Sequence, residues 1–293
     1  MTTPAAGGTL YIVATPIGNL GDVTVRALEV LRAAPLIAAE DTRIARRLLQ
    51  RYEVPTRTVS YHARSGPDRR EALLAHLRGG ADLALVTDAG TPTVSDPGED
   101  LVAAWAAEGG RVVPIPGASA VLAAVAASGL AGPRWGFEGF LPRSGRARRE
   151  RLARVAADDR ATVLFEAPNR LAATLADLAT VAGADRMAAV CRELTKIHEQ
   201  VIRGSLGSLV TAAGDGTIPP RGEAVIVVGP PEPDSATAPR RSAPTLAAAV
   251  AAVEDLVAGG LGRSAAARQV AAETGLPRRA LYAGGAGNSE RDG

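Results

Sequence analysis

The N-terminal part of the chain alternates short apolar runs with amphipathic segments, and this alternation limits the fold more than any other feature. Five apolar runs have the pattern of strands and begin at residues 9, 36, 57, 81 and 111. The segments between them have apolar residues at helical spacing and are bounded by Gly, Pro or Asp. Mainly apolar strands separated by helices are typical of a mostly parallel sheet covered on both faces. We therefore predict an N-terminal α/β domain over residues 9–128.

Carboxylates mark two expected helix starts in this domain. Asp41 precedes TRIARRLLQRY and is expected to cap that helix. In DPGEDLVAAWAAEGG, we expect Asp96 at the N-cap, Pro97 at the first helical position and Glu99 at the third. Together with Glu40 and Arg43, Asp41 forms a polar constellation, so a role toward substrate stays open beside capping.

The order of elements changes after GLAGPRWG (129–136). A strand, an arginine-rich helix, a strand at 161–167 and a helix at 169–182 lead to two adjacent strand candidates, RMAAVCREL and KIHEQVIRG, and to a last strand in 222–229. Adjacent strands indicate a mixed, partly antiparallel sheet, so we predict a second α/β domain over 136–229.

The remaining segments are predicted from composition. Residues 230–244 are rich in Pro, Ser and charge and are expected to form a linker. Residues 245–283 are expected to form a small helical domain, with Gly275 and Pro277 at a turn that fits a helix-turn-helix as well as a plain three-helix cap. Flexible tails are expected at 1–8 and 284–293.

Composition excludes several classes of site. One cysteine and three scattered histidines do not supply a structural zinc site, so we expect no metal. The sequence has no Walker A loop, no G-x-G-x-x-G after the first strand and no G-x-S-x-G. It shows no signal-peptide pattern and no apolar stretch long enough for a membrane span, so we expect a cytoplasmic protein without a membrane partner.

Three loops that follow apolar strands are unusually rich in Gly, Pro and small residues. They are TPIGNLGD (15–22), TDAGTPTVSDPG (87–98) and PIPGASA (114–120). Each alone could be ordinary turn chemistry. Because ligands collect at the carboxyl ends of strands in open α/β sheets, three such loops at one edge predict a cleft for a small ligand.

Several motifs carry a resemblance to a known family. In order along the chain they are ATPIGNLGD, AAEDTR, VTDAGTPTVSDPG, PIPGASA, GFLPR, RELTK and GEAVIVVG. From about Thr9 to Gly229 the sequence resembles the ribosomal RNA small subunit 2′-O-methyltransferase I family of the tetrapyrrole methylase superfamily. The resemblance implies a two-domain, homodimeric enzyme that uses S-adenosylmethionine (AdoMet). Its substrate would be the ribose 2′-oxygen of a cytidine in the decoding centre of 16S ribosomal RNA, most suitably in the assembled small subunit.

The resemblance also implies site residues by motif. The cofactor contacts it implies are Pro16, Ile17, Asp88, Ala89, Gly90, Thr91, Ser119, Ala120, Phe165, Arg192 and Ala224. Glu166 lies beside them at a strand end facing the cleft. The chain departs from the family at LFEAPNR (164–170), where one aromatic residue and one histidine are missing. Asn169 stands in place of the histidine and can only form hydrogen bonds.

Lys196 is the single lysine of the chain, whereas every other basic side chain of the Lys/Arg type is arginine. A ribose hydroxyl must lose its proton during methyl transfer, and lysine can lose its own proton where arginine effectively cannot. We expect Lys196 to act on the 2′-oxygen as base or electrostatic partner, near Arg192 and Arg170, with Glu193 or Glu166 orienting it. A phosphate contact and a purely structural role stay open.

An arginine-rich run at 142–154 adjoins the expected cleft and suits contacts to RNA phosphates, although a solvated helix face would have the same composition. The expected RNA-binding arginines are Arg43, Arg143, Arg146, Arg148, Arg149 and Arg170. Two other functions remain open: C-methylation of a tetrapyrrole, which needs no such run, and a non-catalytic RNA-binding or assembly factor.

Overall fold

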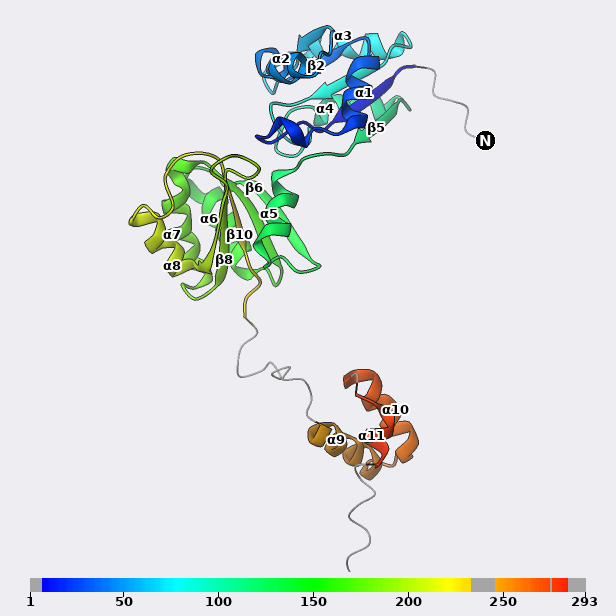
Figure 1. The fold of residues 1–293 in the computed structure, drawn as a ribbon, viewed down its shortest axis with the longest axis vertical. Helices are drawn as coiled ribbons and strands as arrows, with labels where there is room; N and C mark the ends of the chain where they lie inside the picture. Colours follow the sequence, from blue (N-terminus) through cyan, green and yellow to red (C-terminus); the bar gives the residue numbers. More distant parts are fainter. Residues whose placement is uncertain (1–6, 233–245, 275, 284–293) are drawn as a thin grey trace, which may run out of the picture. The chain divides into compact units, whose positions relative to one another are not determined.

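The computed structural model describes residues 7–232, 246–274 and 276–283, and the chain divides into two compact units, Met1–Pro231 and Glu232–Gly293 (Figure 1). The expected tail at 284–293, Gly275, and most of the expected tail at 1–8 and of the linker at 230–244 lie outside the described residues.

A five-stranded parallel sheet forms the first half of the larger unit. Its order is β3-β2-β4-β1-β5, and every pairing is parallel. The strands are β1 (Thr9–Val13), β2 (Ile37–Ala39), β3 (Thr58–Ser60), β4 (Leu83–Val86) and β5 (Arg111–Ile115). Helices α1 (Val25–Ala33) and α2 (Thr42–Arg51) pack on one face, and α3 (Pro67–Arg78) and α4 (Glu99–Ala107) on the other. The parallel sheet covered on both faces is confirmed.

A mixed five-stranded sheet forms the second half. Its order is β6-β7-β10-β8-β9; β6 runs parallel to β7, and the other pairings are antiparallel. The strands are β6 (Trp135–Phe140), β7 (Ala161–Glu166), β8 (Met187–Arg192), β9 (Gln200–Ser205) and β10 (Ala224–Val228). Helices α6 (Gly145–Ala157), α7 (Leu171–Ala182) and α8 (Leu206–Gly214) cover one face. The mixed sheet is confirmed, but residues 193–199 form a turn before β9, where the sequence indicated strand.

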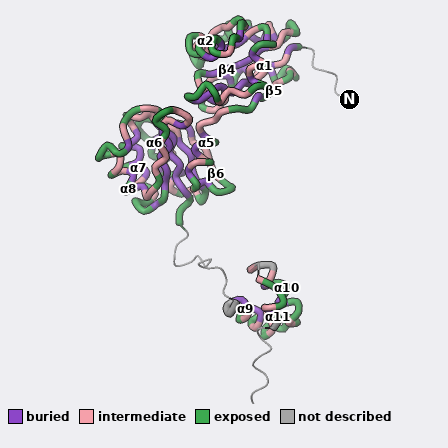
Figure 2. The backbone as a smooth tube through the Cα atoms, viewed as in Figure 1, coloured by how far each residue is buried: buried purple, intermediate pink, exposed green. Residues whose placement is uncertain are grey.

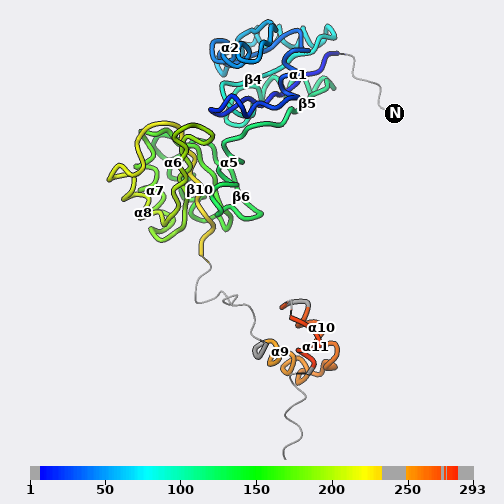
Figure 3. The backbone as a smooth tube through the Cα atoms, in the orientation of Figure 1, coloured from blue at the N-terminus to red at the C-terminus, as the bar shows by residue number. Residues whose placement is uncertain are grey.

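Helix α5 (Ala120–Ser128) covers the other face of the second sheet. Its buried residues Val121 and Ala124 belong to one core with Val163, Ala189 and Val225, and Figures 1 and 3 show it alongside β10. The expected boundary after residue 128 assigned this helix to the N-terminal domain, whereas it packs on the second sheet. The loop before α5 therefore leads from the first sheet to the second.

The start of α4 differs from the sequence prediction. The N-cap is Gly98 (φ 120°), so the expected cap at Asp96 is wrong. A Cβ atom at Gly98 would lie 2.5 Å from Leu85 Cδ2, so glycine is required both by the backbone angle and by this close packing. The helix begins later than expected, and Asp96 is left to accept a hydrogen bond from Thr87 Oγ1 at 3.1 Å. Asp41 does cap α2, by accepting from the Arg43 amide at 2.8 Å.

The smaller unit contains α9 (Leu246–Ala258), α10 (Arg263–Thr274) and α11 (Arg278–Ala283) around a core of Ala249, Val253, Ala266, Val270 and Leu281. Figure 2 shows how burial in the larger unit concentrates in its two sheets. Among the described helices, none is both long and apolar enough to cross a bilayer.

Candidate active site between the two sheets

Backbone hydrogen bonds hold the three glycine-rich loops together. Thr15 N donates to Gly90 O at 2.8 Å, and Gly90 N donates to Thr15 O at 3.0 Å, which joins the first loop to the second. The Thr15 hydroxyl also donates to Thr87 O at 3.2 Å. The third loop is tied in through Ala14 N to Ile115 O (3.2 Å) and Thr91 Oγ1 to Ala118 O (3.4 Å). The loops therefore form one wall at the carboxyl edge of the parallel sheet, as expected.

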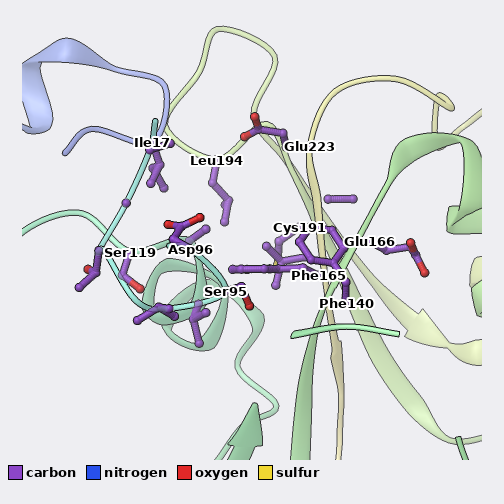
Figure 4. Close-up of a pocket in the computed structure, with 18 of the residues that line it drawn as sticks. Ile17, Ser95, Asp96, Ser119, Phe140, Phe165, Glu166, Cys191, Leu194 and Glu223 are labelled. Atoms are coloured by element: carbon purple, nitrogen blue, oxygen red, sulfur yellow. The ribbon is translucent and has the colours of Figure 1, made fainter. Parts of the chain in front are cut away.

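A cavity of about 340 Å³ lies between this wall and the second sheet (Figure 4). The sequence-predicted residues that line it are Ile17, Ala89, Gly90, Thr91, Ser119, Ala120, Phe165, Glu166 and Ala224. The other lining residues, which the sequence analysis did not name individually as cofactor contacts, are Val94, Ser95, Asp96, Val121, Phe140, Ala167, Pro168, Cys191, Leu194, Glu223 and Val225. Its size falls within the usual range for small-molecule sites, and apolar side chains dominate its walls with a few polar groups among them.

Three predicted cofactor contacts do not line this cavity. Pro16 is buried beside Ile17 without reaching it. Asp88 turns toward the loop after β2, where its carboxylate accepts a hydrogen bond from the Asp41 amide at 3.1 Å. Arg192 is only 5% exposed, and its guanidinium donates to Gln200 Oε1 at 3.0 Å and to the Arg221 carbonyl. These hydrogen bonds fix Arg192 within the sheet end instead of leaving it free for a ligand.

Two loops at the cavity share an unusual backbone pattern. Thr93 and Ser95 have φ of 75° and 63° and flank Val94, while Glu193 and Thr195 have φ of 49° and 66° and flank Leu194. Val94 and Leu194 both line the cavity. Left-handed conformations at non-glycine residues are strained, and they persist where the surrounding structure holds them, often at ligand sites. Composition gave no signal for this pattern, because none of the four strained residues is glycine or asparagine.

Asp96 is an acidic side chain of the cavity that the sequence predicted instead as a helix N-cap. Partial burial raises the pKa of its carboxyl to about 6, opposed by the hydrogen bond from Thr87 and reinforced by the charges of Glu40 and Asp88. Figure 4 shows the Asp96 side chain within the cavity, between the two walls. A carboxylate whose pKa is close to neutrality is suited to proton transfer.

Lys196 forms its ion pairs with carboxylates, whereas the sequence drew attention to cations near it. Its Nζ is 2.9 Å from Glu193 Oε1 and 3.1 Å from Glu223 Oε2. Partial burial opposes the charged form of the lysine, but hydrogen bonds and charges from the two glutamates outweigh it and raise the pKa of Lys196. A Cβ atom at Gly18 would lie 2.4 Å from Lys196 Cγ, so the lysine stem packs directly on the first loop. The amine therefore stays protonated at neutral pH.

Glu166 has partners other than Lys196. Its side chain is fully buried, accepts from Thr174 Oγ1 at 2.6 Å and from the Ala167 amide at 2.8 Å, and pairs with Arg170 Nε at 3.2 Å. Of the two expected orienting residues, Glu193 contacts Lys196 and Glu166 does not. Arg170 also donates a hydrogen bond to the Leu141 carbonyl at 2.8 Å.

The predicted RNA-binding arginines differ in exposure. Arg148 is 9% exposed, and its guanidinium is held by Asp177 at 2.7 Å, by Thr174 Oγ1 at 2.9 Å and by the Pro142 carbonyl at 3.0 Å. This side chain fastens α6 to α7 and is not available as a mobile surface cation. The exposed members are Arg43, paired with Asp41, Arg146, paired with Glu150, and Arg143 and Arg149, which have no ion pair among the described residues.

The fold and the cavity together define an α/β protein with a small-ligand site between a parallel sheet and a mixed sheet. A family model described as Tetrapyrrole (Corrin/Porphyrin) Methylases matches residues 9–210. A Synechocystis protein named "Ribosomal RNA small subunit methyltransferase I" is 48% identical over 94% of this chain and 96% of its own. A protein of the same name from Xylella fastidiosa strain Temecula1 is 45% identical over 97% of this chain and 100% of its own. The chain therefore belongs to the tetrapyrrole methylases and, within them, to the family of these relatives.

Solved structures agree at the level of the fold. A cobalt precorrin-4 methyltransferase superposes with a TM-score of 0.58 at 20% identity, covering 75% of this chain and 94% of that one. A diphthine synthase gives a TM-score of 0.59 at 18% identity, covering 76% and 90%. A uroporphyrin-III C-methyltransferase from Thermus thermophilus, complexed with S-adenosyl homocysteine, gives 0.54 at 19% identity, covering 76% and 97%.

Proposed function

We propose that this chain is an AdoMet-dependent methyltransferase that acts on the ribose 2′-oxygen of a cytidine in the decoding centre of 16S ribosomal RNA. The observation that carries the proposal is near full-length identity of 48% to a protein named as a small-subunit ribosomal RNA methyltransferase, in a chain whose cavity lies at the loops expected to bind the cofactor. The motifs of those loops make up most of the sequence resemblance.

The cavity fits AdoMet in size and chemistry. Ala89, Gly90 and Ala120 leave room for a ligand to approach the backbone. Ile17 and Leu194 supply apolar contacts, and the hydroxyl groups of Thr91 and Ser119 can form hydrogen bonds. When bound, AdoMet supplies an electrophilic methyl group on a positively charged sulfur. In this proposal Asp88 and Arg192 support the walls through the side-chain hydrogen bonds described above, and Pro16 does so as a buried residue beside Ile17.

The acceptor hydroxyl has a pKa far above neutrality, so its proton must pass to a group in the cavity. Asp96 can accept that proton, since its carboxylate lines the cavity and has a pKa raised to about 6 by burial. Lys196 stays protonated but does not line the cavity; its ammonium pairs with Glu193 and with the wall residue Glu223, so in this proposal it positions Glu223 and offsets that negative charge near the developing oxyanion. Glu193 orients Lys196, and Glu166 orients Arg170.

The exposed arginines supply the RNA side of the proposal. Arg43, Arg143, Arg146 and Arg149 are exposed, and Arg170 is partly exposed, so all five can approach phosphates. We further propose that the protein acts as a homodimer in the cytoplasm and that its substrate is the assembled small subunit. Light scattering with the full chain tests the dimer, and a comparison of subunits with free 16S RNA tests the substrate.

The test of the reaction uses AdoMet with a labelled methyl group and small ribosomal subunits that lack the modification. Digestion of the RNA to nucleosides should place the label on one ribose 2′-oxygen, of a cytidine. Label on a base would contradict the 2′-O assignment. Absence of label with AdoMet bound in a parallel titration would point to another acceptor, and absence of AdoMet binding would leave a non-catalytic RNA-binding protein.

A further inference from the structure

A second cavity, of about 720 Å³, lies at the carboxyl ends of the parallel strands β6 and β7. It shares Phe140 and Ala167 with the AdoMet cavity, so the two spaces adjoin along these residues. We call the second space the β6–β7 groove; its lining includes Phe140, Arg143, Arg148, Asn169, Arg170 and Asp177.

Phe140 presents an aromatic surface at the border of the two cavities. The side chain is 51% exposed, although large apolar side chains are normally buried. Its ring centroid is 5.4 Å from that of Phe165 (Figure 4), and the Phe165 ring packs in turn against Phe137 at 5.0 Å. The ring is thus supported from behind and half open, which is the arrangement of a platform on which a planar group can stack.

The charges of the β6–β7 groove leave one cation uncompensated. Arg148 is balanced by Asp177 at 2.7 Å, and Arg170 by Glu166 at 3.2 Å. Arg143 is exposed and forms no ion pair within the described parts of the chain. The exposed amide of Asn169 adds a donor and an acceptor to the same groove. A ligand that matches the groove has a planar face, hydrogen-bonding edges and one negative charge.

We propose that the β6–β7 groove binds one nucleotide of the substrate RNA, with its base stacked on Phe140, its phosphate on Arg143 and its ribose at the border with the AdoMet cavity. The inference rests on the proposed RNA methyltransferase function and adds a site for the acceptor. A nucleotide fits better than an acidic peptide, because a peptide would use Arg143 but would leave the supported ring of Phe140 without a planar partner.

The test uses the full chain and the variants Phe140→Ala, Phe140→Trp and Arg143→Ala, with Arg26→Ala as a control for an exposed arginine on α1 of the first half. A fluorescein-labelled single-stranded RNA oligonucleotide is titrated with S-adenosylhomocysteine present, and KM and kcat are measured on small subunits. Phe140→Ala should weaken binding about 5- to 150-fold, and Phe140→Trp should restore it. Arg143→Ala should raise KM and leave AdoMet affinity unchanged. The slope of log RNA affinity against log salt concentration should fall by the equivalent of about one phosphate contact. Arg26→Ala should behave as wild type.

Crosslinking of a thiouridine-containing RNA should map to Phe140 or its immediate neighbours in the wild-type protein. The inference is overturned if both Phe140→Ala and Arg143→Ala keep the RNA affinity and the KM of the wild type. Methyl transfer by the wild type would in that case still support the proposed function. If the wild type transfers no methyl group but the crosslink appears and both variants lose RNA affinity, the proposed function is wrong and the nucleotide site is supported. A poly-glutamate peptide that competes as well as RNA would refute the nucleotide assignment, and failure of the wild type to bind RNA would refute it as well.

Discussion

Lys196 and Glu223 form an ion pair beside the cavity that we propose binds AdoMet, with 3.1 Å between Lys196 Nζ and Glu223 Oε2. Glu223 lines the cavity and Lys196 does not; the stem of the lysine packs on Gly18 of the first loop. The lysine thus links the turn after β8 to a loop of the parallel sheet. Its raised pKa keeps the amine charged at neutral pH, which fits the proposed role of a fixed positive charge better than that of a neutral base.

Replacement of this charge gives the first prediction. Lys196→Arg keeps a cation near Glu193 and Glu223, so kcat/KM on small subunits should stay within about tenfold of wild type, whereas Lys196→Ala should lose about 100-fold. The exposed neighbour Ile197, 97% accessible, supplies the control variant Ile197→Ala, which should be neutral. An inactive Lys196→Arg enzyme, together with a wild-type rate that climbs through pH 9 to 10, would instead indicate a lysine base.

Asp96 should govern the rate at acidic pH. Burial raises the pKa of this carboxyl to about 6, so kcat should fall as the pH drops below about 6 and the carboxylate becomes protonated. Asp96→Asn should lower kcat about 100- to 10,000-fold and remove this limb from any residual rate. Glu99→Gln, at an exposed acid of the same segment, is the matched control. An Asp96→Asn enzyme that retains the wild-type pH profile would exclude Asp96 as the proton acceptor.

The same pKa predicts how stability depends on pH. The folded-state pKa of Asp96 is raised above the unfolded value near 4, so its contribution to stability is complete below pH 4 and is lost as the pH rises through about 6. Asp96→Asn cannot ionise, so it should gain up to about 2 kcal/mol over wild type between pH 4 and pH 8, a value reduced for partial solvent exposure. Urea unfolding of both proteins at the two pH values measures the difference, and parallel curves at both would contradict the assigned pKa.

The sequence predicted the sheets and three loops because those features depend on local pattern. Apolar runs between helical segments are enough to indicate the parallel sheet, and turn residues after them located Ile17, Gly90 and Ser119. The sequence did not show that α5 packs on the second sheet, since its small apolar residues fit either sheet. Asp96 was misread because DPGE matches a capping pattern, whereas the helix is capped at Gly98, whose backbone angle and lack of room for a side chain beside Leu85 cannot be read from the local sequence.

Contacts between residues that are far apart in the sequence also could not be predicted from local pattern. Lys196 was expected among cations because Arg192 is close along the chain, yet β10 pairs with β8 and brings Glu223 to the lysine. Sheet pairing decides which charges meet, and sequence spacing does not reveal it for strands that are far apart in the chain.

Gly98 should tolerate no side chain. Gly98 (φ 120°) has Leu85 Cδ2 at 2.5 Å from a Cβ position, whereas Gly216 (φ 86°) has nothing within 4 Å. Gly98→Ala should therefore lose about 2 to 4 kcal/mol from backbone strain plus overpacking, and Gly216→Ala only about 1 kcal/mol from strain. Thermal and urea unfolding of the two variants measure the difference. Equal losses of stability in the two variants would mean that the clash with Leu85 adds nothing to the cost of backbone strain.

Arg148 and Arg149 are neighbours in the arginine-rich helix and should separate structural from RNA-binding effects. Arg148→Ala removes the bonds to Asp177 and Thr174, so the free energy of unfolding should fall by about 2 kcal/mol. Arg149 is exposed and without an ion pair in the described chain, so Arg149→Ala should leave stability unchanged and lower the salt dependence of RNA binding by about one phosphate contact. Urea unfolding and RNA titrations at several salt concentrations give both quantities for each variant. An Arg148→Ala protein of wild-type stability that loses RNA affinity would restore Arg148 to the RNA-binding surface.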